Sequence, residues 1–292
     1  MKPMVMERLR KYLENQSLAR RFTIGPAGIL KNPLQASETA PSVVESLPSS
    51  EHLIATEKQA LSAFFGKDIA VPEPPAELFQ TLEKMSKLGI TGFEPHFLPQ
   101  FSLTEEDQLP GWKVKPNPCF WLDIKAGRFP ADAATLQEGW YLVDKRKKPN
   151  YHMDKQRYEN DYVEPIIQDL RKTDKIKKDN FRMPETSRFR VTPDEIEQVI
   201  LPEIVRIIGT KGELTNKRYI EFNVWGNMFY PEWGQTNTCE WFADKLGDDR
   251  WLRGGNSSQL YNGLENVRLG WPGERFGDGA FNPVIRFPSK PR

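Results

Sequence analysis

Apolar residues recur at helical spacing in the first part of the chain. This pattern predicts helices over residues 4–22, 51–65 and 77–88. Residues 23–50 between the first two are rich in Pro, Ser, Thr and Ala and are typical of a linker. We found no residue pattern that indicates chemistry here. We therefore interpret residues 1–110 as a helical and linker segment with a packing or attachment role.

The pattern changes after Gly111, where aromatic residues become dense. Residues 140–143 are continuously apolar and predict a strand, and the basic residues over 145–150 predict a solvated turn after it. An apolar stripe over 162–171 predicts a helix. The basic run over 171–178 has no interleaved aromatic residues. We therefore interpret it as the exposed end of this helix rather than as a nucleic-acid patch.

The best-marked helix begins at Thr192. Proline follows at the first helical position and Glu195 completes a capping box. Pro202 predicts a kink and Gly209 predicts the end of the helix. The apolar face is carried by four isoleucines spaced four residues apart, at positions 196, 200, 204 and 208. We expect a strand over 218–230, followed by a region rich in Gly, Trp and Asn.

Two segments, 251–255 (WLRGG) and 281–287 (FNPVIRF), are predicted to form framework strands near the end of the chain. No helical or strand period persists between them, and large apolar, charged and small residues are mixed. A surface loop system held by strands at both ends accounts for this pattern. The abundance of Tyr, Trp, Arg, Ser, Gly and Asn is typical of the contact surface of a binding protein.

Composition limits the function classes. The 292 residues contain 41 Lys and Arg against 40 Asp and Glu, a net charge of +1, which does not support a nucleic-acid-binding field. We find no signal peptide and no apolar run of membrane-spanning length, and we expect no membrane insertion. The sequence is compatible with a virion-associated protein, or with a protein that is cytoplasmic before it assembles into a larger particle. The two cysteines, Cys119 and Cys239, are better explained as free thiols than as one disulfide.

Candidate catalytic and metal-binding chemistry is sparse. The three histidines are His52, His96 and His152, so the last 140 residues offer none for metal ligation or general base catalysis. Cys239 precedes a glutamate, which disfavours a thiolate. The segment 253–256 (RGGN) lacks the spacing of a phosphate loop, and the acidic residues after it match no calcium loop. We predict no catalytic residue, metal or cofactor.

Four pairs of segments resemble the variable proteins of diversity-generating retroelements. They are 140–144 (WYLVD) with 148–151 (KPNY), 158–162 (YENDY) with 170–171 (LR), 221–227 (EFNVWGN) with 231–238 (PEWGQTNT), and 251–257 (WLRGGNS) with 280–285 (AFNPVI). Formylglycine-generating enzymes share the Arg-Gly-Gly element. The usual closing Gly-Phe-Arg-Pro is replaced by AFNP at 280–283. The resemblance covers about residues 111–288.

This resemblance implies an α+β chain with a C-type lectin fold. In such a fold two helices flank a small antiparallel sheet and a long loop-rich region, here preceded by the mostly helical N-terminal segment. Residues 111–292 would form a display domain with a variable region at about 256–280. An error-prone reverse transcriptase that rewrites adenines would diversify the surface loops, which would bind a protein or cell-surface ligand. The N-terminal segment would attach the domain to a larger particle, such as a viral tail or surface assembly.

The resemblance also divides the loop residues into two sets. The scaffold would be Trp251, Arg253, Gly254, Gly255 and Phe281, with Asn262, Gly263, Leu264 and Val267 holding the loop. The displayed, ligand-binding set would be Leu260, Tyr261, Glu265, Arg268, Leu269, Trp271, Glu274, Arg275, Phe276 and Asp278. Inward packing of Leu264, Leu269 and Trp271 is the alternative.

Two other functions stay open at the level of the sequence. A formylglycine-generating oxidase would need a reactive cysteine pair, which only Cys239 and the distant Cys119 could supply. A lectin-like virion protein of fixed specificity would bind glycans through calcium. Asn256, Glu265 and Asp278 are its loosely matched candidate ligands.

Overall fold

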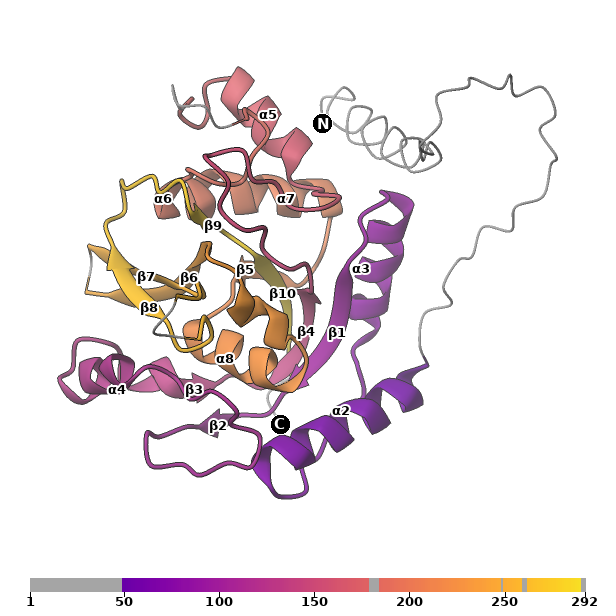
Figure 1. Ribbon diagram of the computed structural model, residues 1–292. Helices are drawn as coiled ribbons and strands as arrows, with labels where there is room; N and C mark the ends of the chain where they lie inside the picture. Colours follow the sequence, from indigo (N-terminus) through magenta and orange to yellow (C-terminus); the bar gives the residue numbers. More distant parts are fainter. Residues whose placement is uncertain (1–48, 179–183, 248, 259–261, 290–292) are drawn as a thin grey trace, which may run out of the picture.

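The computed structural model describes residues 49–178, 184–247, 249–258 and 262–289 (Figure 1). Over these residues the chain is a mixed α+β protein in which helices pack around three sheets, which confirms the α+β part of the predicted fold class. The helix expected over 4–22, and the linker expected after it up to residue 48, lie outside the described residues.

The main sheet has four strands in the order β1-β4-β10-β5, all antiparallel to their neighbours. Their bounds are β1 Phe93–Leu98, β4 Gly139–Asp144, β10 Pro283–Pro288 and β5 Glu213–Asn216. Every residue of β4 is buried, so both faces of the sheet are covered at this strand. The strands predicted around residues 140 and 281 are therefore confirmed as the two central strands.

A second sheet carries the C-terminal region, with strand order β8-β7-β6-β9. Its strands are β8 Val267–Gly270, β7 Arg250–Gly254, β6 Cys239–Leu246 and β9 Gly279–Ala280. The pairs are antiparallel except β6 with β9. A third sheet pairs β2 Phe101–Ser102 with β3 Thr135–Leu136. Between these strands in sequence lie the helix α4 Pro118–Lys125 and the 3-10 helix η1 Ala131–Ala134.

The two helices expected within residues 51–88 are present as α2 Ser50–Phe65 and α3 Ala76–Lys87. Ser49 caps α2 by accepting a hydrogen bond from the His52 N–H. Helix α2 lies against β1 and α8, and α3 lies against β4 and α7. Strand β1 pairs with β4, so elements on both sides of the boundary expected at residue 110 share one sheet and one core.

The two helices predicted after β4 are confirmed. Helix α5 spans Glu164–Lys172. The isoleucine-rich helix begins as α6 Pro193–Glu195, continues as a π-helical segment η2 Ile196–Ile200 and ends as α7 Leu201–Ile208. Its capping box at Thr192 is formed, and Gly209 ends it with a φ of 64°. The π-helical segment ends two residues before Pro202, whose missing N–H interrupts regular α-helical hydrogen bonding.

The strand expected over 218–230 is wrong. These residues form α8 Tyr219–Met228, followed by the 3-10 helix η3 Pro231–Gln235. Nearly all of α8 is buried, because α2, β6 and η3 surround it, so the helix has no polar face that would reveal its period. Its start is fixed by Glu221, whose carboxylate accepts the Arg218 backbone N–H at 2.8 Å.

Two basic residues expected at the surface are buried. Lys148, in the turn after β4, and Arg171, at the end of α5, are each 2% exposed. The Arg171 guanidinium donates to the carbonyl oxygens of Glu185 at 2.8 Å and Ser187 at 2.9 Å. It therefore fixes the backbone over 185–187, because a buried arginine needs acceptors for its N–H groups.

Candidate ligand-binding face

Strand β7 is the centre of the predicted scaffold. Trp251 is 3% exposed and Phe281 is fully buried. A Cβ on Gly254 would lie 2.2 Å from the Asn266 carbonyl oxygen, and Gly255 adopts a φ of 85°. Both glycines are therefore required by the backbone.

The loop after β7 is held by its own side chains and by the helix beneath it. The Gly263 N–H donates to the Gly234 carbonyl oxygen at 2.9 Å, and Asn262 Oδ1 accepts the Leu264 N–H at 3.0 Å. Leu264 is 2% exposed and packs toward Gly234. Asn262, Gly263 and Leu264 thus anchor this part of the loop. Leu260 and Tyr261 lie outside the described residues.

Two of the predicted displayed residues face solvent from the β8 end of the second sheet. Arg268, on β8, is exposed, and Trp271, directly after it, is 48% exposed. The Arg250 guanidinium lies over the Trp271 ring, 4.8 Å from its centroid. Leu269 is half-buried against the core. Figure 1 shows β8 at an outer edge of the molecule, away from α2 and α3.

The turn over 274–278 is tied to the framework more closely than the sequence indicates. Glu274 accepts the Trp271 N–H at 2.8 Å. Arg275 donates to the Arg190 carbonyl oxygen at 2.8 Å and pairs with Glu195. Burial opposes ionisation of Glu195, but the hydrogen bond from Arg275 contributes to a lowered pKa. We define the candidate face as β8, Trp271 and the turn over 274–278. Arg275 is part of this face and also ties it to the framework.

Phe276 and Asp278 in the same turn contact the framework arginine. The Phe276 ring lies 3.5 Å from the Arg253 guanidinium carbon, and its centroid is 5.6 Å from that of Trp241. The Asp278 carboxylate lies 3.6 Å from Arg253. Glu265, the remaining candidate, is half-buried, and its carbonyl oxygen accepts the Tyr219 hydroxyl at 2.7 Å.

A buried charge group lies beneath Gly255. Glu240 accepts from Lys148 Nζ at 3.4 Å and from Lys217 Nζ at 2.6 Å, and all three side chains are about 1% exposed. Lys148 also donates to the Trp233 carbonyl oxygen at 3.1 Å. Burial lowers the pKa of Lys148, against the attraction of Glu240. The solvated turn expected over 145–150 is therefore wrong at Lys148, which supports the loop backbone from below.

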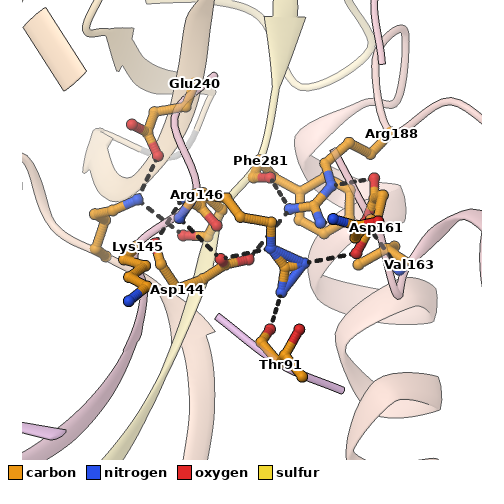
Figure 2. Close-up of polar contacts among 12 residues, drawn as sticks. Thr91, Asp144, Lys145, Arg146, Asp161, Val163, Arg188, Glu240 and Phe281 are labelled. Carbon is orange, nitrogen blue, oxygen red and sulfur yellow. Dashed lines mark hydrogen bonds and ion pairs between the residues drawn. The ribbon is translucent and has the colours of Figure 1, made fainter. Parts of the chain in front are cut away.

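A second buried group joins β4 to the segments before α5 and before α6 (Figure 2). Arg188 donates to both carboxylate oxygens of Asp161 and to the Phe281 carbonyl oxygen at 3.1 Å. Arg146 pairs with Asp144 at 3.0 Å and donates to the Thr91 carbonyl oxygen at 2.6 Å. Burial raises the pKa of Asp144, although Arg146 and Arg188 oppose this. Arg188 follows segment 158–162, and no local pattern in the sequence predicts its role.

The buried cysteine, Cys239, does not have the surroundings of a catalytic thiol. Both are free; Cys119 is exposed and Cys239 is buried. Burial, assisted by Asp278, raises the pKa of Cys239 to about 11, although Arg253 donates to its Sγ atom at 3.1 Å. Such a thiol is almost fully protonated at neutral pH, which gives no support to a formylglycine-generating oxidase.

Metal and membrane chemistry can be checked over the described ranges. Within them, no group of three or more His, Cys, Asp or Glu side chains is arranged to hold a metal ion. In the same part of the chain, none of the helices combines the length and apolar character needed to span a bilayer.

A loop that the sequence analysis did not assign borders the turn over 274–278. Tyr151 is 42% exposed and Met153 is 68% exposed, and Met153 has a φ of 47°. The loop is fixed at Tyr151, whose N–H donates to Asn237 Oδ1 at 2.6 Å, and at Gln156, whose side chain donates to the Gly277 carbonyl oxygen. Two large apolar side chains are thus presented on a constrained backbone beside the candidate face.

A groove of about 560 Å³ opens on the other side of the loop over 262–266. One wall comes from the segment before α4 and from α4 itself, and the other comes from the loop. The lining includes Lys113, Lys115, Pro116, Trp121, Asn262 and Glu265. The candidate face is therefore bordered by a loop with apolar side chains on one side and by a groove on the other.

Comparison with known proteins adds no relative. Neither a scan against protein-family models nor searches of curated proteins and of solved structures returned a match for this chain.

Proposed function

We propose that the chain is a ligand-binding display protein with a C-type lectin fold. Its surface loops over about 256–280 would be diversified by adenine-directed mutagenic reverse transcription and would bind a protein or cell-surface ligand. The observation that carries this proposal is the difference in solvent exposure between paired residues on two adjacent strands. Arg268 on β8 is exposed, whereas its partner Arg253 on β7 is 9% exposed within the framework.

This contrast is what a diversified binder needs. Substitutions at solvent-facing positions change stability by about 0.5 kcal/mol or less, whereas buried framework positions tolerate few changes. Gly254, whose Cβ would collide with the Asn266 carbonyl oxygen, fixes the backbone without help from the exposed side chains. Affinity can then come from a few aromatic or arginine anchors, such as Trp271.

The neighbouring loop extends the proposed face. Tyr151 and Met153 lie outside the region expected to vary, yet they are exposed apolar side chains on a fixed backbone. Residues that keep a positive φ despite carrying a side chain are often found at functional sites. We infer that these two residues provide a constant apolar contact beside the variable one.

Sequencing the 3′ part of the gene in several isolates tests the proposed diversification. We expect substitutions at the codons of the displayed residues, traceable to adenines in a nearby imperfect repeat beside a reverse transcriptase gene. Identical alleles, or changes spread evenly over the framework codons, would contradict the proposal.

A protein-level experiment tests the division between framework and face. One library randomises Arg268, Leu269 and Trp271; a matched library randomises Trp251, Leu252 and Arg253 on the adjacent strand. We expect most members of the first library to fold and most members of the second to be lost, measured by protease resistance on the surface of yeast. Equal losses in the two libraries would remove the structural basis of the proposal.

A further inference from the structure

We propose that the groove beside α4 receives an extended acidic segment of the protein ligand. This inference rests on the proposed function, because it names the chemistry of one part of the ligand. The groove adjoins the loop over 262–266, so a ligand that covers the candidate face would reach it. Its volume of about 560 Å³ lies within the range of roughly 300–1,000 Å³ found for ligand sites.

The charges of the groove favour an acidic occupant. Lys113 and Lys115 are exposed, and within the described part of the chain neither ammonium group has a carboxylate at ion-pair distance. Lys115 Nζ donates to the Asp107 carbonyl oxygen at 3.1 Å. Two cations without carboxylate partners on one wall would attract an acidic segment and orient it.

The two glutamates of the groove do not cancel this charge. Glu105 is paired with Lys125 at 2.7 Å, and Lys125 also lies 3.4 Å from Glu106, so the Glu105 charge is partly compensated. Glu265 lies on the opposite wall and belongs to the set expected to vary. Variation at position 265 would therefore change the electrostatic potential in the groove, while the two lysines stay constant.

The lysine wall is held rigidly. Asn227 Oδ1 accepts the backbone N–H groups of Lys113 and Val114 at 2.9 Å each, and Asn227 Nδ2 donates to the Val114 carbonyl oxygen at 2.9 Å. One amide side chain of α8 thus fixes the backbone that carries both lysines. A prearranged wall loses little conformational entropy when a ligand binds.

The distance between the walls is fixed as well. The Tyr219 hydroxyl accepts the Asn117 N–H at 2.9 Å and donates to the Glu265 carbonyl oxygen at 2.7 Å. The same oxygen atom therefore joins the two backbone segments that carry the walls. Pro116, Pro118 and Trp121 supply an apolar lining, against which the backbone of an extended peptide can pack.

The test uses the full-length protein and a fluorescein-labelled octapeptide of alternating glutamate and proline. Binding is measured by fluorescence anisotropy at low and high salt. Octapeptides in which glutamine or lysine replaces glutamate are the comparison probes. The Lys113→Glu/Lys115→Glu variant removes the proposed contacts. The Lys172→Glu/Lys175→Glu variant makes the same charge change at exposed lysines around the end of α5, which Figure 1 shows on a different side of the molecule from α4.

We expect saturable binding of the glutamate peptide that weakens with salt and is absent for the lysine peptide. The Lys113→Glu/Lys115→Glu variant should lose about tenfold or more in affinity, and the α5 variant should bind as the unaltered protein does. Circular dichroism spectra must match among the proteins. No binding of the glutamate peptide, or equal losses in the two variants, would overturn the proposal. Neither result bears on the diversification of the gene, which the allele comparison decides separately.

Discussion

The Arg253 guanidinium carbon lies 3.5 Å from the centroid of the Phe276 ring. Arg253 belongs to the framework strand β7, whereas Phe276 belongs to the turn expected to vary. Arg253 also donates to the Cys239 Sγ atom and lies near the Asp278 carboxylate. The turn and the framework therefore share one set of contacts, and the displayed residues differ in how much they contribute to stability.

Replacing Phe276 by alanine should destabilise the protein. The change removes the ring from between Arg253 and Trp241 and loses both a cation–π contact and apolar packing. We expect a loss of about 2 kcal/mol in the free energy of unfolding, measured by urea denaturation. Trp271→Ala, at a far more exposed ring, serves as the control and should cost less than half as much. Equal costs would show that Phe276 is not supported by the framework.

Gly254→Ala should be among the most damaging small substitutions in the chain. The new Cβ would lie 2.2 Å from the Asn266 carbonyl oxygen, and a backbone atom cannot move aside as a flexible side chain can. We expect a loss of about 3 kcal/mol or more, or failure to fold. Gly273→Ala is the matched control, because a Cβ there meets no atom within 4 Å. A tolerated Gly254→Ala would contradict the backbone geometry described for β7.

Two arginines of the candidate face should respond differently to alanine. Arg275 donates to the Arg190 carbonyl oxygen and pairs with Glu195, so Arg275→Ala should cost about 1–2 kcal/mol. Arg268 is exposed on β8, and Arg268→Ala should change stability by about 0.5 kcal/mol or less. Thermal unfolding of the two variants side by side measures the difference. An unchanged melting temperature for Arg275→Ala would place Arg275 among the freely variable residues.

The Cys239 thiol should make stability fall at alkaline pH. Its pKa is raised from 9.0 to about 11 in the folded protein, so between these values the unfolded chain has lost a proton that the folded chain keeps. Stability contributed by the protonated thiol is complete below pH 9 and lost as the pH rises toward 11, by up to about 2–3 kcal/mol. Urea denaturation of the unaltered protein and of Cys239→Ala over this range measures the effect, and the variant should show the shallower decline. Parallel curves would argue against the buried thiol.

Local sequence signals predicted the parts of the fold that local interactions determine. The capping box at Thr192 and the helix end at Gly209 need only neighbouring residues, and both are formed. The strand over 140–143 was evident because its residues are continuously apolar and buried on both faces. The stretch Phe93–Leu98 was not assigned, since it contains Pro95 and His96 and pairs with β4 across a long sequence separation.

The errors arise where burial by distant segments overrides the local pattern. Helix α8 is surrounded by other elements and therefore shows no amphipathic period. Lys148 reads as part of a basic turn, yet Glu240 and the Trp233 carbonyl oxygen, both more than 80 residues away in sequence, make its burial favourable. No spacing rule identifies such a partner in advance.

The candidate face was predictable in outline and not in detail. The glycines at 254 and 255 indicated a tight backbone, and the loop anchors at 262–264 follow that interpretation. The partners of Arg275 and Phe276 come from residues 190, 195 and 253, which only the fold brings close. The groove combines residues near 115 with residues near 265 and has no signature in either segment alone.

Asn266 Nδ2 donates to the Asn256 carbonyl oxygen at 2.8 Å, and the Asn266 carbonyl oxygen accepts the Gly255 N–H at 3.0 Å. The two stems of the intervening stretch are thus clasped at their base. Codons added between those of Ser258 and Asn262 would leave both the clasp and the anchors at 262–264 in place, since lengthening a loop costs only about 0.6 kcal/mol per doubling. Alleles could then differ in the number of residues in this stretch as well as in their identity.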